Sequence, residues 1–558
     1  MNTLLTLHNP SAARAYYATG VWQPDTMYTR LAHHAATRPD AFALRDSRRR
    51  LTWSALRRWV DAVAHTLDAK GLRQGDRVCV WLPNRVEATI VFLACSRNGY
   101  VCNPSLHQNY TVAEVVTLME RLSAVTLFAQ PGYGADAKAE NIFQRANAVA
   151  SLKNVFVLDA PAGMEGMEGT QPFPQPMASV TAQSPVIEDP DKIVYLAFTS
   201  GTTGRPKGVL HSDNTLLANA RAMVRDWHHD VRTIVYSLSP LSHHIATVAL
   251  VQMLVAGMEL VVNDAPPGKR PIDWIIESGA TYVMGVPTHA IDIIAEMKTR
   301  GLQQLGAVKV FYMAGSTIPP ATAQSFLSLG IKPQNIYGMT ENSSHQYTLP
   351  TDDENTITAT CGKAGHGYEV KLWNADNNDI EVGPGEIGEI GGRGGVLMLG
   401  YFDNQAATEQ SFNRHGWFMS GDLGRFDANG NLEIVGRKKD MIIRGGRNIY
   451  PSQIEDHAKK HPDIRVAAAI PMPDDRLGER VCLTIIASHG VVLSGDAVLA
   501  HLAASGLSKY DMPEYYLQME VYPLTASGKV LKRELIEWLK SGRIKPAPVR
   551  WVAPKDAP

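Results

Sequence analysis

The stretch T-S-G-T-T-G-R-P-K-G occupies residues 199–208 and decides how the rest of the chain is interpreted. It follows I-V-Y-L-A-F, residues 193–198, whose apolar and β-branched side chains predict a buried strand. Glycines let a backbone approach a ligand closely, hydroxyls and backbone N–H groups donate hydrogen bonds, and Lys207 adds a positive charge. The composition therefore indicates a loop that holds a polyphosphate, with an ordinary Gly-rich surface loop as the alternative. The loop is not Walker A, because Pro206 precedes the lysine and Gly208 follows it.

Length and composition set the broad class of the protein. The chain has 558 residues, and at roughly 100 to 200 residues per domain this length predicts three or four structural units. Lys plus Arg number 54 against 55 Asp plus Glu, so no overall charge favours nucleic acid or an anionic membrane. The five cysteines are dispersed, which indicates a reducing compartment and ordinary core thiols. No signal peptide or spanning segment is recognisable, so we expect a cytoplasmic protein without stable membrane association.

Hydrophobic periodicity predicts an α/β fold. Helical and strand patterns alternate over residues 54–158 and again over residues 216–313, which is typical of βα units with mostly parallel sheets. From about residue 362 to 436 short strands separated by Gly and Asn turns predict a β-rich subdomain. Residues 437–558 predict a compact α+β domain. We therefore expect a large N-terminal domain over residues 1–436, with two α/β lobes and the β-rich subdomain, followed by a small C-terminal domain.

Four later motifs follow the phosphate loop in a fixed order. They are Y-G-M-T-E at 337–341, S-G-D at 420–422, G-R-K-K-D at 436–440 and P-L-T-A-S-G-K at 523–529. With the loop, they resemble the adenylate-forming superfamily, which includes acyl-CoA synthetases, adenylation domains of peptide synthetases and beetle luciferases. The resemblance implies an AMP-forming acid–thiol ligase that uses ATP, Mg²⁺ and CoA. It also implies that the small C-terminal domain is mobile and rotates between two half-reactions.

The resemblance assigns roles to individual residues. The nucleotide is expected to contact Thr199, Ser200, Gly201, Thr202, Thr203, Gly204, Lys207, Gly315, Ser316, Tyr337, Gly338, Met339, Thr340, Asp422, Arg437 and Lys529. Tyr337 corresponds to the aromatic residue beside adenine, and Asp422, helped by Arg437, corresponds to the residue that accepts both ribose hydroxyls. A carboxylate is suited to two O–H donors.

The catalytic roles implied by the resemblance concern charge. Thr340 is expected beside the α-phosphate and Glu341 is expected to bind Mg²⁺, a hard cation that prefers carboxylate oxygens. Lys529 is expected to bridge the α-phosphate and the acyl carboxylate during adenylation. Lys439 corresponds to the hinge between the two conformations. Gly445 and Gly446 correspond to the turn along the pantetheine arm of CoA, although a plain turn is an alternative.

The acyl pocket is expected around P-L-S-H-H, residues 240–244. Adjacent histidines on a strand point to opposite faces, so His243 and His244 are not expected to share a metal ion. The resemblance places His243 beside the reacting carboxylate, and the expected pocket residues are His243, His244, Val286, Pro287, Gly315 and Gly338. Members that activate amino acids carry an Asp just after the position of His243, which this chain lacks. An apolar monocarboxylic acid is therefore favoured, either aromatic, alicyclic or medium-chain.

Two further stretches resemble particular subfamilies, but several alternative functions stay open. Residues 337–347 and 361–364 resemble cyclohexanecarboxylate and medium-chain acyl-CoA ligases. The leading prediction is an acid–CoA ligase; the alternative in the same fold is an enzyme that loads the phosphopantetheine of a separate carrier protein. A luciferase-like oxidative member and a non-catalytic member are further alternatives. The oligomeric state, including a homodimer, is left open.

Overall fold

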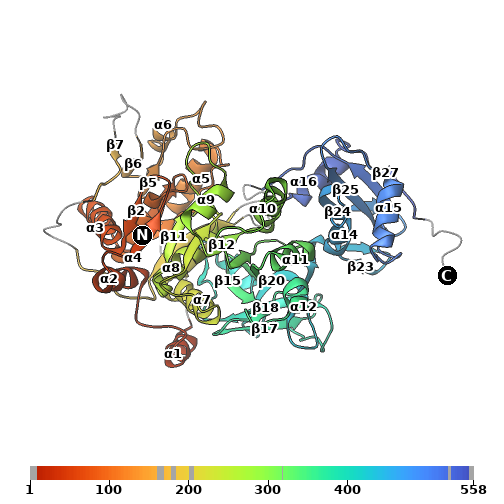
Figure 1. The fold of residues 1–558 in the computed structure, drawn as a ribbon, viewed down its shortest axis with the longest axis horizontal. Helices are drawn as coiled ribbons and strands as arrows, with labels where there is room; N and C mark the ends of the chain where they lie inside the picture. The colour runs from red at the N-terminus through yellow and green to blue at the C-terminus, as the bar shows by residue number, and fades with distance from the viewer. Residues whose placement is uncertain are drawn as a thin grey trace. The chain divides into compact units, whose positions relative to one another are not determined.

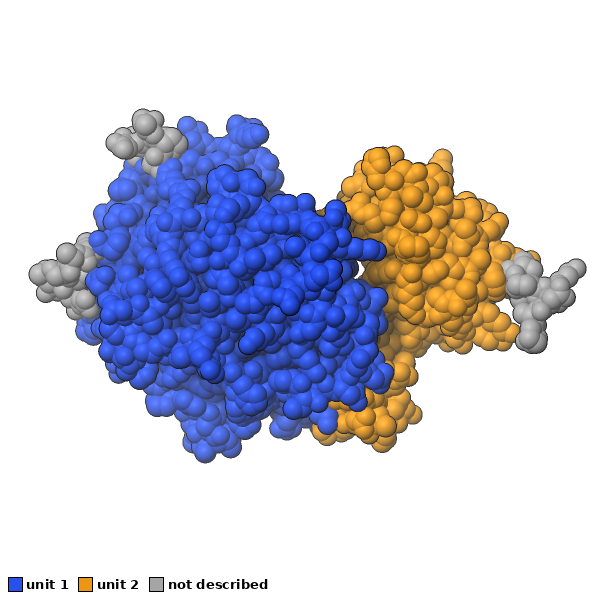
Figure 2. All heavy atoms as spheres, in the orientation of Figure 1, with its two compact units in different colours: residues 1–370, 392–418 blue, residues 371–391, 419–558 orange. Residues whose placement is uncertain are grey.

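The chain folds as two compact units. The computed structural model describes residues 9–159, 169–176, 184–199, 206–316, 318–525 and 529–551. Unit 1 comprises residues 1–370 and 392–418, and unit 2 comprises residues 371–391 and 419–558, as Figure 2 shows by colour. The predicted domain boundary after residue 436 and the predicted rotation of a C-terminal domain stay predictions.

An eight-stranded sheet in unit 1 contains the strand that precedes the phosphate loop. Its order is β19-β9-β8-β4-β3-β5-β6-β7. The strands from β8 to β7 are mutually parallel, whereas β9 runs antiparallel to β8. The strands are Arg77–Trp81 (β3), Val101–Asn103 (β4), Thr126–Ala129 (β5), Asn154–Val157 (β6), Thr170–Pro172 (β7), Ile193–Thr199 (β8), Lys207–Ser212 (β9) and Gly400–Tyr401 (β19).

A nine-stranded sheet forms the second half of unit 1. Its order is β16-β15-β14-β13-β12-β10-β11-β1-β2, with a parallel centre from β14 to β1 and antiparallel strands at both edges. The strands are Phe42–Arg45 (β1), Arg50–Thr52 (β2), Ile234–Ser237 (β10), Glu259–Val262 (β11), Tyr282–Gly285 (β12), Val310–Met313 (β13), Lys332–Met339 (β14), Ser343–Tyr347 (β15) and Lys363–Ala364 (β16).

Helices cover both sheets (Figure 1). Helix α4 contacts β3 and β4 of the eight-stranded sheet, and α8 contacts β10, β11, β12 and β15 of the nine-stranded sheet. Helix α2 contacts both α4 and α8 and so joins the two halves. The helices of unit 1 are Pro10–Ala18 (α1), Met27–Thr37 (α2), Trp53–Ala69 (α3), Val86–Asn98 (α4), Val112–Leu122 (α5), Ile142–Ala146 (α6), Asp213–Asp226 (α7), His244–Ala256 (α8), Pro271–Ser278 (α9), Pro287–Arg300 (α10), Pro320–Ser328 (α11), Glu354–Ala359 (α12) and Gln405–Gln410 (α13).

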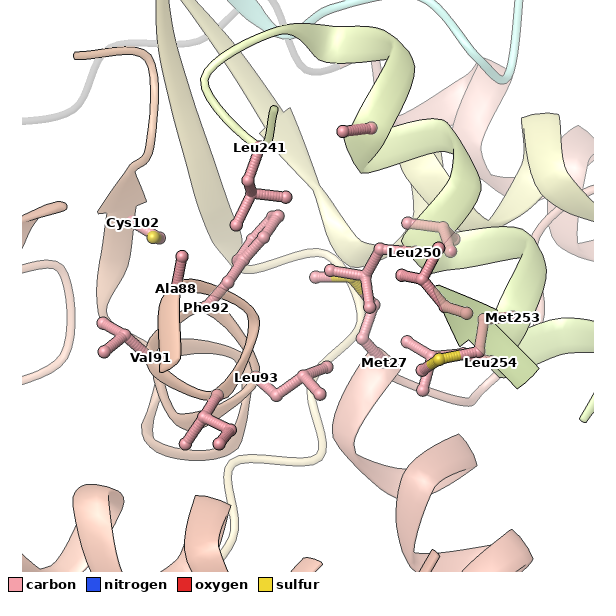
Figure 3. Packing of buried hydrophobic residues seen from close by; sticks show 14 of the residues in the cluster. Met27, Ala88, Val91, Phe92, Leu93, Cys102, Leu241, Leu250, Met253 and Leu254 are labelled. Atoms are coloured by element: carbon pink, nitrogen blue, oxygen red, sulfur yellow. The ribbon is translucent and has the colours of Figure 1, made fainter. Parts of the chain in front are cut away.

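The largest core lies where α2, α4 and α8 meet. All residues of α4 are buried, and a helix that is apolar on nearly every side requires partners on every side. In Figure 3, Phe92 and Leu93 of α4 and Leu250 of α8 lie in this core with Met27 of α2. The ring of Phe92 also stacks on Tyr195 of β8, with centroids 5.7 Å apart. The core therefore connects directly to the strand that precedes the phosphate loop.

Unit 2 contains the small α+β part of the chain. A four-stranded sheet has the order β17-β18-β20-β21, and the boundary between the two units falls within β17, β18 and β20. A second sheet has the order β23-β22-β25-β26-β27, and β24 pairs with β25. The strands are Tyr368–Trp373 (β17), Gly388–Gly394 (β18), Phe418–Phe426 (β20), Leu432–Arg437 (β21), Ile442–Arg444 (β22), Arg447–Ile449 (β23), Ile464–Asp474 (β24), Gly478–Ala487 (β25), Tyr515–Gln518 (β26) and Ala547–Pro548 (β27). The helices are the 3₁₀ turn Lys438–Asp440 (η1), Pro451–Ala458 (α14), Gly495–Ala504 (α15) and Lys532–Lys540 (α16).

The predicted α/β class is confirmed. Individual strands show which parts of the fold hydrophobic periodicity could predict. Within the alternating pattern expected over residues 216–313, the structure has the short apolar strands β10, β11 and β12. Strand β15, S-S-H-Q-Y, was not expected because it is polar and yet fully buried. Several of its polar groups bond within the protein; the Ser344 hydroxyl, for example, lies 2.7 Å from the hydroxyl of Tyr312, and Gln346 Nε2 donates to the Gly362 carbonyl at 2.7 Å. Such a strand carries no hydrophobic alternation from which it can be predicted.

The structure bears on two expectations from the sequence, the state of the cysteines and the presence of membrane-spanning helices. All five cysteines are unpaired, as expected for core thiols, and four of them are buried. Among the described residues, no helix is both long and apolar enough to span a membrane. The cytoplasmic location stays a prediction.

Replacing Phe92 by Ala should destabilise unit 1. Phe92 is 0% exposed, and removing a buried aromatic ring leaves a cavity that costs about 3–5 kcal/mol of unfolding free energy. Denaturant unfolding followed by tryptophan fluorescence measures the effect. Ile291→Ala is the matched control, because Ile291 is 44% exposed and its truncation should cost less than about 0.5 kcal/mol. Similar midpoints for the two variants would contradict the assignment of this core.

Candidate active site

The phosphate loop connects two antiparallel strands of the eight-stranded sheet. Thr199 ends β8 and Lys207 begins β9, and the two residues are opposite each other in the ladder. The backbone N–H of Phe198 donates to the Ser105 hydroxyl at 2.8 Å, which ties the end of β8 to the neighbouring loop. The predicted loop residues Ser200, Gly201, Thr202, Thr203 and Gly204 lie outside the described residues. The described ends of the loop are thus set by strand pairing.

A cation, an aromatic ring and a carboxylate come together beside this loop. The ammonium nitrogen of Lys207 lies 4.1 Å from the centre of the Tyr401 ring. The Tyr401 hydroxyl donates to Glu341 Oε1 at 3.0 Å, and Glu341 is only 8% exposed. Burial lowers the pKa of Lys207, and the negative charge of Glu341 opposes that shift. Two predicted residues therefore meet through Tyr401, which the sequence motifs did not identify.

Thr340 and Glu341 lie on a tight turn between β14 and β15. The backbone N–H of Asn342 donates to the carbonyl of Met339 at 3.1 Å, and the N–H of Met398 donates to the carbonyl of Glu341 at 2.7 Å. Ser343 has φ +53°, a left-handed conformation that costs a residue with a side chain about 1–3 kcal/mol. The turn is thus strained and is held by its surroundings.

Gly338 is required by the same turn. A β-carbon placed on Gly338 would lie 1.8 Å from the carbonyl oxygen of Ser343, well inside van der Waals contact. The glycine between Tyr337 and Met339 therefore lets β14 and β15 approach at this point. Tyr337 itself is 8% exposed, and its ring meets His345 edge-on with centroids 5.4 Å apart.

Apolar side chains surround Gly315, one of the predicted pocket residues. Gly315 has φ +95°, and a β-carbon there would lie 3.6 Å from Val286 Cγ1 and 3.9 Å from Ile245 Cδ1. Val286 was predicted for the acyl pocket with Pro287, which is the first residue of α10. Ile245 was not predicted; its position next to His244 at the start of α8 is the signal that could have identified it. Ser316 follows Gly315 and is exposed.

His243 precedes α8 and lies against a second histidine. The rings of His243 and His107 have centroids 4.6 Å apart. His107 Nδ1 is 3.1 Å from the Ser242 hydroxyl, and burial lowers the pKa of His107 to about 4. His107 is therefore a neutral ring at neutral pH. It belongs to no recognisable motif, so sequence reasoning could not place it beside His243.

His244 uses both ring nitrogens within the protein. Nδ1 lies 3.1 Å from the Tyr195 hydroxyl and Nε2 lies 2.9 Å from the Ser343 hydroxyl. Both nitrogens are therefore engaged within the protein. Its role as a residue of the acyl pocket stays a prediction.

Unit 2 carries the predicted ribose pair. Asp422 and Arg437 are opposite each other on β20 and β21, and Arg437 Nε lies 3.2 Å from Asp422 Oδ1. Lys438, the next residue, forms an ion pair with Glu389 at 2.8 Å. The ammonium of Lys439 is partly buried; this burial lowers its pKa, and the nearby charge of Arg437 adds to the shift.

The remaining predicted residues of unit 2 lie on turns. Gly445 and Gly446, with φ +58° and +82°, connect β22 to β23. Lys529 is exposed, its backbone N–H donates to the Thr525 hydroxyl at 2.9 Å, and its carbonyl accepts from the Thr525 N–H at 2.7 Å. Residues 526–528 lie outside the described residues.

The positions of the carboxylates show whether the described residues could bind Mg²⁺. Over the described ranges, no three His, Cys, Asp or Glu side chains converge as a metal site. Mg²⁺ that accompanies a nucleotide usually takes one or two carboxylates, together with phosphate oxygens and water. A single buried carboxylate beside the phosphate loop, Glu341, fits that pattern.

Comparisons with known proteins identify the family of the chain. Residues 31–402 match the family described as AMP-binding enzyme. The chain is 31% identical to the medium-chain fatty-acid–CoA ligase of Escherichia coli K12, covering 95% of this chain and 93% of that protein. It is also 31% identical to the feruloyl-CoA synthase of an Amycolatopsis species, covering 89% of this chain and 96% of that protein.

Solved structures share the fold over nearly the whole chain. ATP-bound MatB from Rhodopseudomonas palustris superposes with a TM-score of 0.77 at 25% identity, covering 92% of this chain and 99% of that one. An anthranilate–CoA ligase in complex with anthranoyl-AMP has a TM-score of 0.82 at 21% identity, covering 94% of this chain and 98% of that one.

Gly338→Ala should damage this site. The added methyl group meets the Ser343 carbonyl, so β14 and β15 must separate, and we expect a loss of about 1–3 kcal/mol in stability together with weaker nucleotide binding. Thermal unfolding and ATP titration measure the two effects. Gly383→Ala is the control, since a methyl group there meets only the Glu386 side chain, at 3.4 Å. Wild-type nucleotide affinity in Gly338→Ala would contradict the described turn.

Proposed function

The chain belongs to the AMP-binding enzyme family and is an AMP-forming acid–CoA ligase, and on this basis we propose that it activates an apolar monocarboxylic acid of the medium-chain or aromatic class. The family membership rests on the match over residues 31–402. The observation that carries the site assignment is the cluster of Lys207, Tyr401 and Glu341 beside the phosphate loop.

The reaction has two balanced steps. The carboxylate of the acid attacks the α-phosphorus of ATP, and pyrophosphate leaves to give an acyl adenylate. The thiol of CoA then attacks the acyl carbon, loses its proton and displaces AMP. Because a carboxylate is a poor electrophile and both partners of the first step are anions, the protein contributes mainly positioning and charge neutralisation.

Named residues suit these tasks in the first step. Following the family resemblance, we assign Lys207 to the β- and γ-phosphates and Thr340 to the α-phosphate; Lys207 begins β9, and the Thr340 carbonyl accepts a hydrogen bond from His211 of the same strand. Glu341 would hold Mg²⁺, which when bound would neutralise phosphate charge. Lys529 would stabilise the negative charge that develops at the α-phosphate, and Asp422 would accept the ribose hydroxyls.

The acid is proposed from the pocket and the relatives together. Val286 and Ile245 contribute aliphatic side chains around Gly315. The curated relatives are named for a medium-chain fatty acid, for ferulate and for a substituted naphthoate. These acids share a carboxylate on a largely apolar body, which agrees with aliphatic pocket walls.

A panel of acids tests the function. The purified chain should form acyl-CoA, AMP and pyrophosphate from ATP, Mg²⁺, CoA and at least one of octanoate, cyclohexanecarboxylate, benzoate or ferulate, with no product from amino acids. Mass spectrometry with and without CoA identifies the products. Pyrophosphate and acyl adenylate without thioester would indicate carrier-protein loading instead. No acid-dependent pyrophosphate from any acid would refute the proposed function.

Lys529→Ala should separate the two steps. Loss of a cation that stabilises transition-state charge should slow adenylate formation by at least ~10², while thioester formation from supplied acyl adenylate continues. Lys540→Ala, which removes a lysine on α16 that pairs with Glu537, is the matched control and should leave both steps unchanged. Equal slowing of both steps in Lys529→Ala would exclude this role.

A further inference from the structure

One buried and one partly buried histidine, His211 and His244, connect the phosphate-loop hairpin to the turn that carries Thr340 and Glu341. His211 belongs to β9, four residues after Lys207, and is 0% exposed. Its Nε2 lies 2.7 Å from the backbone carbonyl of Thr340, and its Nδ1 lies 2.9 Å from the Thr215 hydroxyl. The strand after the phosphate loop is thereby bonded to the first residue of the turn.

His244 makes the equivalent connection from the other end of the turn. It is the first residue of α8 and bonds the hydroxyls of Tyr195 on β8 and Ser343 on β15. The two imidazole rings stack, with centroids 5.7 Å apart and an interplanar angle of 24°. Strands β8 and β9, helix α8 and both ends of the turn therefore meet at one pair of rings.

The contacts define the protonation of His211. A carbonyl oxygen only accepts hydrogen bonds, so the Nε2 that faces Thr340 must carry a proton. Burial lowers the pKa of His211 to about 4 and that of His244 to about 3, so both rings are neutral at neutral pH. Nδ1 of His211 then accepts from the Thr215 hydroxyl.

The hydrogen bonds of His244 are compatible with the same protonation, on Nε2. If the Tyr195 hydroxyl donates to Nδ1, the proton of the neutral ring is on Nε2 and is donated to the Ser343 hydroxyl. Both histidines then direct an N–H group at the turn. Stacking of two neutral rings also avoids the repulsion that two imidazolium ions would experience.

The turn depends on external support because of its own geometry. Ser343 is left-handed, and Gly338 is in close contact with the Ser343 carbonyl. The backbone of Glu341 is held from a third direction by Met398. Without the imidazole donors, the Thr340 carbonyl and the Ser343 hydroxyl would lose their buried partners, and the turn could relax toward a conformation with ordinary backbone angles.

We propose that His211 and His244 are positioning residues for adenylation: as neutral rings bonded to the Thr340 carbonyl and the Ser343 hydroxyl, they hold the turn so that Thr340 and Glu341 are presented to the Mg²⁺–nucleotide complex. The proposal deepens the proposed function and rests on it. Neither histidine touches the reacting atoms, so their effect is exerted through the turn.

Glutamine and leucine substitutions at His211 test this role. Glutamine keeps a side-chain N–H donor, whereas leucine keeps much of the volume and removes the donor. Calorimetry with Mg²⁺ and a non-hydrolysable ATP analogue should show about tenfold weaker binding for His211→Leu, the consequence of the Thr340 carbonyl losing its hydrogen-bond donor, and binding within about threefold of wild type for His211→Gln. In steady-state adenylation, KM for ATP should rise in His211→Leu while KM for the acid stays within about twofold.

Controls separate this role from general stability. His229→Leu replaces a partly buried histidine, stacked on Tyr282, and should leave analogue binding unchanged while thermal unfolding is monitored for every variant. The corresponding pair His244→Gln and His244→Leu provides an independent test if His211→Leu does not fold. Wild-type affinity in a folded leucine variant, or equal weakening by glutamine and leucine, overturns the proposal. Absence of binding by the wild-type protein would instead contradict the proposed function.

Discussion

The burial of helix α4 is the constraint on which the architecture of unit 1 depends. A helix whose every residue is buried cannot lie on a surface, so a sheet and further helices must enclose it. Its polar residues are accommodated by specific partners: Ser96 donates to Asp213 at 2.8 Å, and Asp213 pairs with Lys192 at 2.6 Å. Because β8 packs on this helix through Tyr195 and Phe92, the core also positions the strand from which the phosphate loop departs.

The charged groups of the site are at least partly buried, and burial strengthens their electrostatic interactions. Glu341 is buried and Lys207 is partly buried, and the two are joined through Tyr401, whose pKa is raised by burial and by the carboxylate. In such a low-dielectric setting a cation interacts strongly with an incoming anion. A polyphosphate that binds beside Lys207 would oppose the effect of burial on the lysine. This pairing supports the predicted role of Lys207 as a contact of the nucleotide phosphates.

Local geometry prepares each part of the site within its own unit. In unit 1 the turn of Thr340 and Glu341 is held by hydrogen bonds to His211, His244 and Met398, despite the strain at Ser343. In unit 2 strand register alone places Asp422 opposite Arg437. A two-step reaction requires both sets of residues, and the hinge at Lys439 and the CoA turn at Gly445 and Gly446 remain predictions.

The sequence by itself determined the α/β class, because alternating helix and strand periods are local signals. The glycines, hydroxyls and charged residues of the five motifs also predicted the phosphate loop and the site residues, because fixed spacing is likewise a local signal. The sequence also determined β10, β11 and β12, whose short apolar runs identify buried strands. Only the tertiary structure decided that Tyr401 joins Lys207 to Glu341 and that His107 lies against His243. It also revealed β15, a polar strand buried through hydrogen bonds to distant residues. The physical reason is that these pairings are made across sheets and turns between residues far apart in the chain, and no local period or motif encodes such contacts.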